Sequence, residues 1–413
     1  MRRVAHVGAA LLAIGGIGFV TLYVLMATGV LSTDSEIREV GLLAGVGGAS
    51  IAAAVLVELA VRRRRGSDLV ASIAMPPLWL SGVVLVVSVA LGGIAVWTDR
   101  LPELEPALAI VAVAALTAFI WRLVLRWSPN RRAPARAMLA TMAWGMVVAT
   151  TTAVVLQLAF VAAGIAGIAV GLNLADVQLS GGLIDTLLAD DLLESSGSEL
   201  LGTATIAVFV MLGYAVAAPL TEELTKFLGV AVVLRRQVLS RYTVFVAGIS
   251  AGLGFAVVET IGYALGSGEG WPLVLALRAP VTLIHITGTS LVACGWYLQQ
   301  RRGGYPLVGY FVAAVLVHAA WNGLLVSMIL VSATIPEENP APGAILAVLG
   351  GLGMMLVLLV ACGTWVIANA RRWGREYVEP LGQHVLTVAP AFSGFTPRHD
   401  RLSPVHGPVS GEV

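Results

Sequence analysis

The stretch 219–226, Pro-Leu-Thr-Glu-Glu-Leu-Thr-Lys, places two adjacent carboxylates and the only lysine of the chain inside a segment that is otherwise apolar. Ionisable side chains are costly in a bilayer and persist mainly where they are paired and where function needs them. On a helix, Lys226 lies i, i+4 from Glu222 and i, i+3 from Glu223, with each glutamate preceding the lysine in the favourable order. One ammonium cannot neutralise two carboxylates equally. The second carboxylate therefore points toward another partner, a metal ion or a water molecule.

The composition around this stretch is that of a polytopic membrane protein. Of the 413 residues, 58% are hydrophobic and only 12% are charged, and the mean hydropathy is +0.90. The net charge of +1 gives no reason to expect a nucleic-acid partner. Cys294 and Cys362 both lie in apolar stretches, which predicts small buried side chains rather than a disulfide. The use of arginine for nearly every basic position indicates a GC-rich bacterial genome.

The hydropathy pattern predicts an all-α transmembrane helix bundle with about ten spans, since about 20 apolar residues cross the hydrocarbon core. The first apolar stretch is too long for a cleaved signal peptide and is expected to be a membrane anchor. The expected spans are 8–30, 40–60, 70–97, 107–125, 138–170, 201–234, 243–265, 273–298, 305–332 and 343–369.

Arginines predict the orientation of these spans. Clusters of arginine fall in alternate loops, and the intervening loops are acidic or neutral. Cytoplasmic loops are enriched in basic residues, so ten spans with both termini in the cytoplasm satisfy the alternation throughout. The arginine clusters are Arg2/Arg3, Arg62 to Arg65, Arg131/Arg132/Arg136, Arg235/Arg236/Arg241, Arg301/Arg302 and Arg371/Arg372/Arg375.

The chain divides into three regions by the placement of its polar groups. Residues 1–194 hold five spans with almost no buried polar group, followed from about 171 to 200 by an acidic amphipathic segment expected on the outer membrane face. Residues 195–370 hold all the polar groups at membrane depth. Residues 371–413 form a polar tail with several prolines, expected to be disordered in the cytoplasm.

Further polar side chains occur at membrane depth after residue 226: Glu259, His285, His318 and Asn322. His318 and Asn322 are i, i+4 and share a helix face. This set would suit activation of a water molecule, with an imidazole and an amide stabilising an oxyanion. It would equally suit Zn²⁺ with one open position; the ligands would come from Glu222, Glu259, His285 and His318.

These residues resemble the ordered motifs of PrsW-type intramembrane proteases, which are related to the CAAX prenyl proteases and the bacteriocin-processing enzymes. The matching motifs, within about 219–325, are Glu222-Glu223-x-x-Lys226, Phe255-x-x-x-Glu259, Arg278 followed by His285, and His318-x-x-x-Asn322. The resemblance implies that 195–370 is a catalytic region. It also implies hydrolysis of a membrane-anchored protein, in the best-known case an anti-sigma factor cut at its extracytoplasmic side.

The resemblance also implies roles for single residues. Glu222 would activate water, with His285 assisting. His318 and Asn322 would form the oxyanion site, and Glu223 would pair with Lys226. Apart from the resemblance, Arg278 is expected either as a counter-ion or as a side chain that snorkels to the surface. Whether Glu222 or Glu223 is the base, and whether a metal takes part, stays open. Two positions depart from many relatives, Thr260 in place of Asn and Asn322 in place of Asp, and the amide weakens the case for an anionic metal ligand there.

Other functions fit the sequence less well. There is no His-Glu-x-x-His motif, and every aspartate falls in a loop or tail, which excludes a site-2-type zinc site and an aspartyl dyad. The Gly-x-Ser-x-Gly pattern around Ser250 lies within a span, where its glycines predict close helix packing rather than a nucleophile elbow. The main alternative is a transporter whose Glu and His groups relay protons, although internal repeats are missing. An inactive membrane scaffold is a third.

Overall fold

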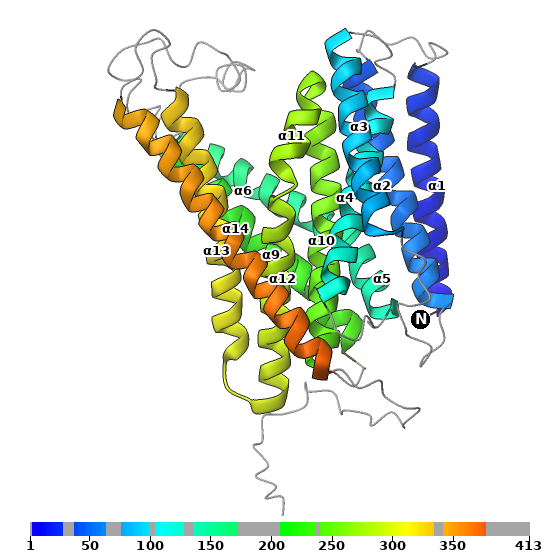
Figure 1. Cartoon of the computed structure of the whole chain (residues 1–413), viewed down its shortest axis with the longest axis vertical. Helices are drawn as coiled ribbons and strands as arrows, with labels where there is room; N and C mark the ends of the chain where they lie inside the picture. Colours follow the sequence, from blue (N-terminus) through cyan, green and yellow to red (C-terminus); the bar gives the residue numbers. More distant parts are fainter. Residues whose placement is uncertain are drawn as a thin grey trace, which may run out of the picture.

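The computed structural model describes residues 2–27, 37–62, 76–98, 104–127, 135–171, 207–235, 240–333 and 342–376, and these ranges contain helices and no strands. Figure 1 shows them as a bundle of long helices, most of which run in roughly the same direction, while α6 and α14 cross it obliquely. The α-helices are α1 (Arg2–Ala27), α2 (Ile37–Arg62), α3 (Leu78–Thr98), α4 (Glu105–Trp127), α5 (Ala135–Trp144), α6 (Thr150–Gly171), α9 (Ala218–Leu234), α10 (Arg241–Gly266), α11 (Trp271–Arg278), α12 (Val281–Arg302), α13 (Pro306–Ala333) and α14 (Pro342–Glu376).

The predicted all-α multi-pass architecture is confirmed. Nine helices in the described ranges are long and apolar enough to cross a membrane. The expected span 40–60 corresponds to α2, a 26-residue helix that contains the shorter apolar stretch Gly45–Leu59. Nine spans plus α2 therefore take the place of the ten spans expected.

Helix α10 forms the centre of the bundle. The most apolar stretch of α10 is 89% buried inside the protein, whereas that of α1 is 11% buried. Its glycines allow this: a Cβ on Gly248 would lie 2.6 Å from the Ser290 Cα, and one on Gly252 would lie 2.5 Å from the His285 carbonyl oxygen. Ser250, between them, donates to the carbonyl of Val246 within its own helix. The Gly-x-Ser-x-Gly pattern thus serves packing of α10 on α12, as expected.

The predicted span 273–298 is wrong in one respect, because two helices occupy it. Helix α11 ends at Arg278, and α12 begins at Val281 after Pro280. Proline lacks an amide hydrogen and clashes with the preceding turn, so a helix usually ends before it. His285 therefore lies in the second turn of α12 rather than in the middle of a span.

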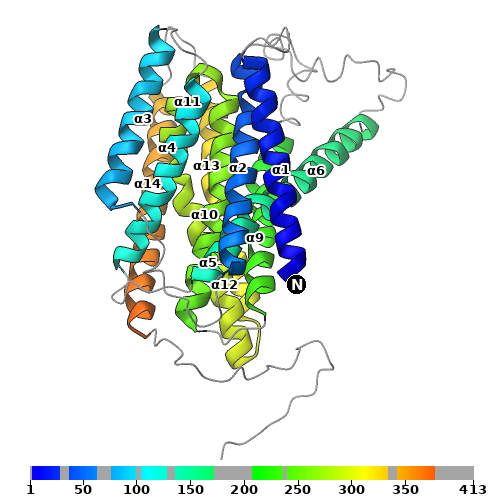
Figure 2. The same ribbon diagram turned by 90° about the vertical axis from the view of Figure 1, so that its right-hand side faces the viewer.

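Two crossings contain π-helical turns. Gly145–Ala149 (η3) joins α5 to α6 in the crossing expected at 138–170, and Gly213–Ala217 (η6) precedes α9 in the crossing expected at 201–234. The second crossing runs continuously over Ala207–Leu234, as predicted for a single span. Each π turn adds one residue to a helix and changes which side chains face the bundle. Figure 2 shows that α6, after η3, leaves the bundle at an angle.

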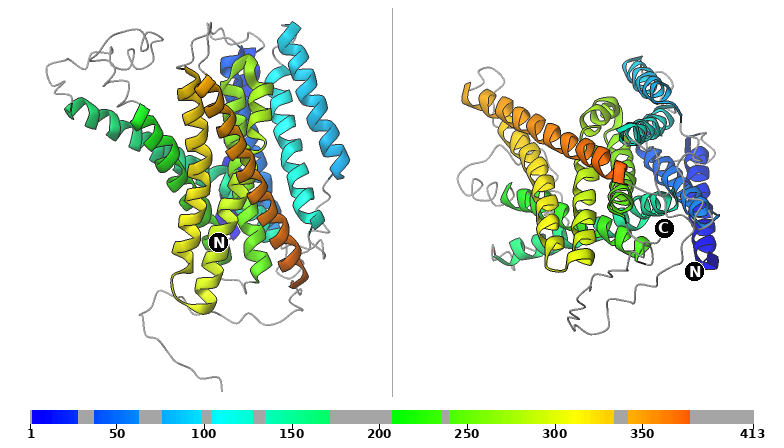
Figure 3. Two further views of the ribbon diagram at one scale, coloured as in Figure 1. Left: turned by 60° about the vertical axis from the view of Figure 1, so that its left-hand side comes forward. Right: turned by 60° about the horizontal axis from the view of Figure 1, so that its bottom comes forward.

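The two ends of the described chain lie on one side of the bundle. Helix α1 begins and α14 ends at the same end (Figures 1 and 3), which agrees with termini on one side of the membrane. That this side is the cytoplasm remains a prediction. The amphipathic segment expected at 171–200 and the tail after residue 376 lie outside the described residues.

Candidate active site

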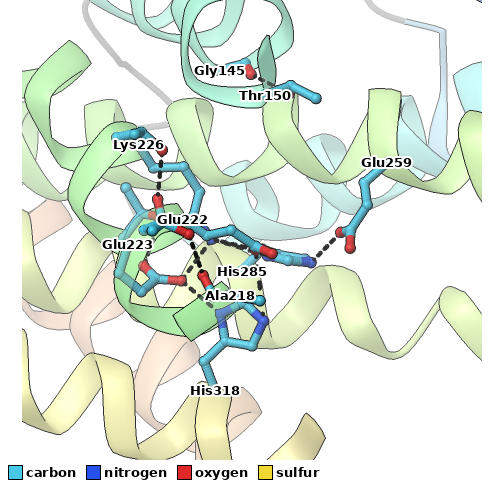
Figure 4. A network of polar contacts seen from close by, with 12 residues as sticks. Gly145, Thr150, Ala218, Glu222, Glu223, Lys226, Glu259, His285 and His318 are labelled. Atoms are coloured by element: carbon cyan, nitrogen blue, oxygen red, sulfur yellow. Dashed lines mark hydrogen bonds and ion pairs between the residues drawn. The ribbon is translucent and has the colours of Figure 1, made fainter. Parts of the chain in front are cut away.

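Four helices bring the predicted polar residues to one place. Helix α9 carries Glu222, Glu223 and Lys226, and α10, α12 and α13 each add one of the residues Glu259, His285 and His318. Figure 4 shows these side chains as one connected network. Except for Glu259, each is buried, with 4% or less of its surface exposed. The motifs that lie far apart in the sequence thus form a single site.

Glu223 is the fully paired carboxylate of this site. Lys226 Nζ lies 2.6 Å from Glu223 Oε1, and Thr289 donates to Glu223 Oε2 at 3.2 Å. The same Oε1 lies 3.1 Å from His318 Nδ1. Gly288 makes room for this carboxylate, since a Cβ there would lie 2.8 Å from Oε2. Both oxygens of Glu223 are occupied, so this residue holds its neighbours in place.

Each histidine has one ring nitrogen beside a carboxylate. His318 Nδ1 contacts Glu223, which as a carboxylate can only accept, so the Nδ1 proton is donated and Nε2 carries the lone pair. His285 Nδ1 lies 3.0 Å from the Lys226 ammonium, which can only donate. The proton of His285 is therefore on Nε2, 2.8 Å from Glu259 Oε2. Each imidazole is fixed in one tautomer by a charged neighbour.

The remaining nitrogens converge on Glu222. Its Oε2 lies 3.8 Å from His285 Nδ1 and 3.7 Å from His318 Nε2. This oxygen has no hydrogen-bond partner among the described residues. The other oxygen, Oε1, accepts a hydrogen bond from Gln157 of α6 at 3.1 Å. Glu222 thus has one oxygen held by a hydrogen bond and one that makes none, although this second oxygen lies 3.6 Å from Lys226 Nζ.

Arg278 forms an ion pair with Glu259. Its Nη2 lies 2.7 Å from Glu259 Oε2, and its guanidinium stacks 4.0 Å from the centre of the Tyr263 ring. The end of α11 at Arg278 places this side chain beside α10. Arg278 and Glu259 therefore support His285 from outside, and Glu259 does not join the group of convergent donor atoms.

The structure places Asn322 away from this cluster. Its amide nitrogen donates to the backbone carbonyl of Tyr214 at 2.9 Å, in the π turn η6. Gln157 and Thr289 are contacts that the sequence motifs did not indicate. Gln157 has a recognisable signal, because it is the only amide side chain in the apolar run 135–171. A threonine in α12 gives no such signal, since Thr282, Thr287 and Thr289 all occur there.

The donor set fits a divalent cation. Glu222, His285 and His318 each offer one ligand atom, and these atoms all lie within 4.8 Å of one another. Two imidazoles and one carboxylate form a common zinc set, whose tetrahedral ligands stand about 3.3 Å apart. Metal-binding histidines usually donate their second ring N–H to a carboxylate, and Glu259 and Glu223 lie in that position beside His285 and His318. A cation at His285 Nδ1 would have to displace the Lys226 ammonium, which lies 3.0 Å from the same atom.

The comparisons with known proteins agree with this site. The sequence model described as "PrsW family intramembrane metalloprotease" matches residues 133–361, a range that contains α9 to α13 and every residue of the cluster. Searches of curated proteins and of solved structures gave no match. The match covers more than half of the chain and begins just before α5. The chain therefore belongs to the PrsW family of intramembrane metalloproteases and is a multi-pass membrane protease.

Proposed function

We propose that this protein is an endopeptidase that cuts a membrane-anchored protein, with Glu222 at the reacting centre. One observation carries the proposal: two carboxylate-backed imidazoles each turn a ring nitrogen toward the same oxygen of one buried glutamate, an oxygen that has no hydrogen-bond partner among the described residues. One of these nitrogens, His285 Nδ1, also contacts the Lys226 ammonium. A purely structural ion pair would not need this convergence. Hydrolysis does, because a water molecule must lose a proton while a carbonyl oxygen gains charge.

Glu222 is the residue that touches the reacting atoms. Gln157 holds its Oε1, so Oε2 stays directed at the space between His285 and His318. From there it can take the proton of an attacking water molecule or ligate a cation. Glu223 serves neither purpose, because Lys226, Thr289 and His318 occupy both of its oxygens.

The charges of the cluster favour a bound cation. Glu222, Glu223 and Glu259 contribute three negative charges, and Lys226 and Arg278 contribute two positive charges, which leaves one negative charge when both imidazoles are neutral. This net negative charge attracts a cation to the cluster. We infer that Glu222, His285 and His318 hold a divalent cation. When bound, it would polarise the scissile carbonyl and make a water molecule more acidic.

The depth of the site indicates where a substrate would be cut. Glu222 is 13 residues from Arg235 and Glu259 is 18 residues from Arg241, which correspond to about 20 Å and about 27 Å of helix. The hydrocarbon core is about 30 Å thick. The site therefore lies nearer the end of the bundle opposite the arginines. With the arginines in the cytoplasm, cleavage would fall in the outer half of the bilayer, as for an anti-sigma factor cut on its extracytoplasmic side.

A cleavage assay in the native membrane tests this proposal. The protein would be co-expressed with a library of single-span membrane proteins, and their processing compared between the unaltered enzyme, Glu222→Gln, Glu223→Gln and His285→Ala. We expect products from the unaltered enzyme alone, and their loss on treatment with a membrane-permeable chelator. Products that persist in Glu222→Gln would refute the assignment of this residue.

The metal content of purified Glu222→Gln separates the two uses of Glu222. A variant that retains the cation but no longer cleaves would assign Glu222 as the base. A variant that loses both would assign it as a ligand.

A further inference from the structure

The π turn η6 leaves one backbone carbonyl without a helical donor. The amide of Ala218 donates to the carbonyl of Gly213, five residues earlier. In this register the next donor, residue 219, would serve Tyr214, but Pro219 has no amide hydrogen. The side chain of Asn322 supplies the missing donor, 2.9 Å from the Tyr214 carbonyl oxygen. A carbonyl without a partner is costly at membrane depth, where no water replaces the missing donor, so this contact stabilises the π turn.

The π turn sets the direction in which the two glutamates of α9 point. One extra residue in a helix rotates the part before it by about 100° relative to the part after it. Before the turn, Phe209 stacks on Phe160 of α6 with ring centres 5.6 Å apart. After the turn, Glu222 and Glu223 face the histidines. The Phe209–Phe160 stacking and the contacts of the two glutamates with the histidines can both form only while the helix keeps the extra residue of the π turn.

Tyr214 joins this turn to the other side of the site. Its hydroxyl lies 3.4 Å from that of Tyr263, whose ring lies under the Arg278 guanidinium. Arg278 in turn holds Glu259, the carboxylate beside His285. A displaced Tyr214 would therefore disturb both Glu222 and His285.

We propose that Asn322 is a positioning residue that holds η6 and thereby aims Glu222 at the two histidines. The inference rests on the proposed function and replaces the oxyanion role expected for Asn322 from its motif. The amide nitrogen, which would have to meet an oxyanion, is directed at the protein backbone instead. Gln157 acts on the carboxylate of Glu222 itself, whereas Asn322 acts on the helix that carries it.

The test compares Asn322→Asp, Asn322→Leu and Asn322→Gln. Aspartate has the same shape but as a carboxylate cannot donate, leucine removes the polar group, and glutamine keeps a donor. The matched control is Asn369→Asp, because Asn369 donates in the same way to the Trp365 carbonyl in α14. Three quantities are measured in lipid nanodiscs: peptide cleavage, Co²⁺ affinity from its visible absorption, and backbone hydrogen exchange of residues 213–222.

We expect Asn322→Asp and Asn322→Leu to lower kcat about tenfold or more, because each variant loses the hydrogen bond that holds η6. They should also weaken Co²⁺ binding and speed exchange in 213–222, while Asn322→Gln recovers part of each and the control changes none. A fall in kcat with unchanged Co²⁺ affinity and exchange would assign an oxyanion donor and overturn the inference. Unchanged values for all three quantities would overturn it too. If the unaltered protein neither cleaves nor binds Co²⁺, the proposed function fails, while the exchange measurement still decides whether Asn322 holds η6.

Discussion

The helices α1 to α4 and the helices α9 to α13 are built with the same packing device but a different use of charge. In the first group, a Cβ on Gly16 of α1 would lie 2.7 Å from the Gly47 carbonyl oxygen of α2, and in the second, Gly252 approaches α12 just as closely. Among the described residues of the first group, His6 and Glu58 form an ion pair, and their side chains are 45% and 29% exposed. Glu105, at the start of α4, is buried. The pair Lys226–Glu223 of the second group is fully buried.

This difference separates what holds the helices together from what the protein does. Small residues let helices approach and need no buried charge. Buried ion pairs contribute little net stability compared with apolar packing, because their desolvation is costly. The charges of α9 to α13 are therefore best explained by chemistry. The match to the family model agrees, since it includes α9 to α13 and excludes α1 to α4.

The largest expected effect comes from removing the carboxylate at the centre of the site. Glu222→Gln should lower the rate of cleavage roughly 10²- to 10⁴-fold, because the amide cannot take a proton from water. The rate would be measured with a purified single-span substrate in nanodiscs. Glu58→Gln, the same change in α2, is the control and should cleave like the unaltered enzyme. If Glu58→Gln lowered the cleavage rate as much as Glu222→Gln, the carboxylates of the two regions would not differ in their importance for catalysis.

The next effect concerns stability. Lys226→Met leaves Glu223 charged in a fully buried position, so we expect a loss of about 3–5 kcal/mol in the free energy of unfolding. Unfolding by increasing detergent denaturant would measure it. The double variant Lys226→Met/Glu223→Gln should recover most of this stability, since position 223 no longer carries an unpaired charge, but not the activity. If the double variant is no more stable than the single one, charge pairing is not what Lys226 provides.

Loss of the Arg278–Glu259 ion pair should have a smaller effect on activity. Arg278→Gln leaves Glu259 without its 2.7 Å counter-ion, and residues behind metal ligands typically change metal affinity or activity about 10- to 100-fold. Arg278→Lys should recover part of the loss, because an ammonium keeps the charge but stacks less well on Tyr263. Co²⁺ titration and cleavage rates would be compared for both variants. Equal defects in the two would show that charge is not the property that matters.

The sequence predicted the helices and the members of the cluster better than their exact orientation. Hydropathy located α4 and α13 to within two residues of the expected 107–125 and 305–332. The depth of Glu259, His285 and His318 was sufficient to predict that they meet. The tautomers of the histidines could not be predicted, because they depend on which charged group lies behind each ring.

The π turns and their partners could not be predicted from periodicity. A single extra residue at η3 or η6 leaves a helix just as apolar and just as long, and only the packing on both sides requires it. Pro219 gave a local hint of an irregularity, but its consequence for Tyr214 depends on Asn322, 108 positions along the chain. The functional role of Asn322 stays a prediction, and its contact with Tyr214 was not foreseen.

The smallest expected effect is in the first region. His6→Gln removes a half-exposed ion pair with Glu58, and such pairs are typically worth about 0.2–1 kcal/mol. Cleavage should stay within about twofold of the unaltered enzyme, because neither residue touches the site. A much larger loss of cleavage would indicate that the change reaches the site through the contact between α2 and α10. In this contact Gly45 of α2 packs against Ile261 and Leu265 of α10, the helix that carries Glu259. In that case the packing of α1 and α2 would help to fix the position of α10. The His6–Glu58 ion pair would then affect catalysis through that packing.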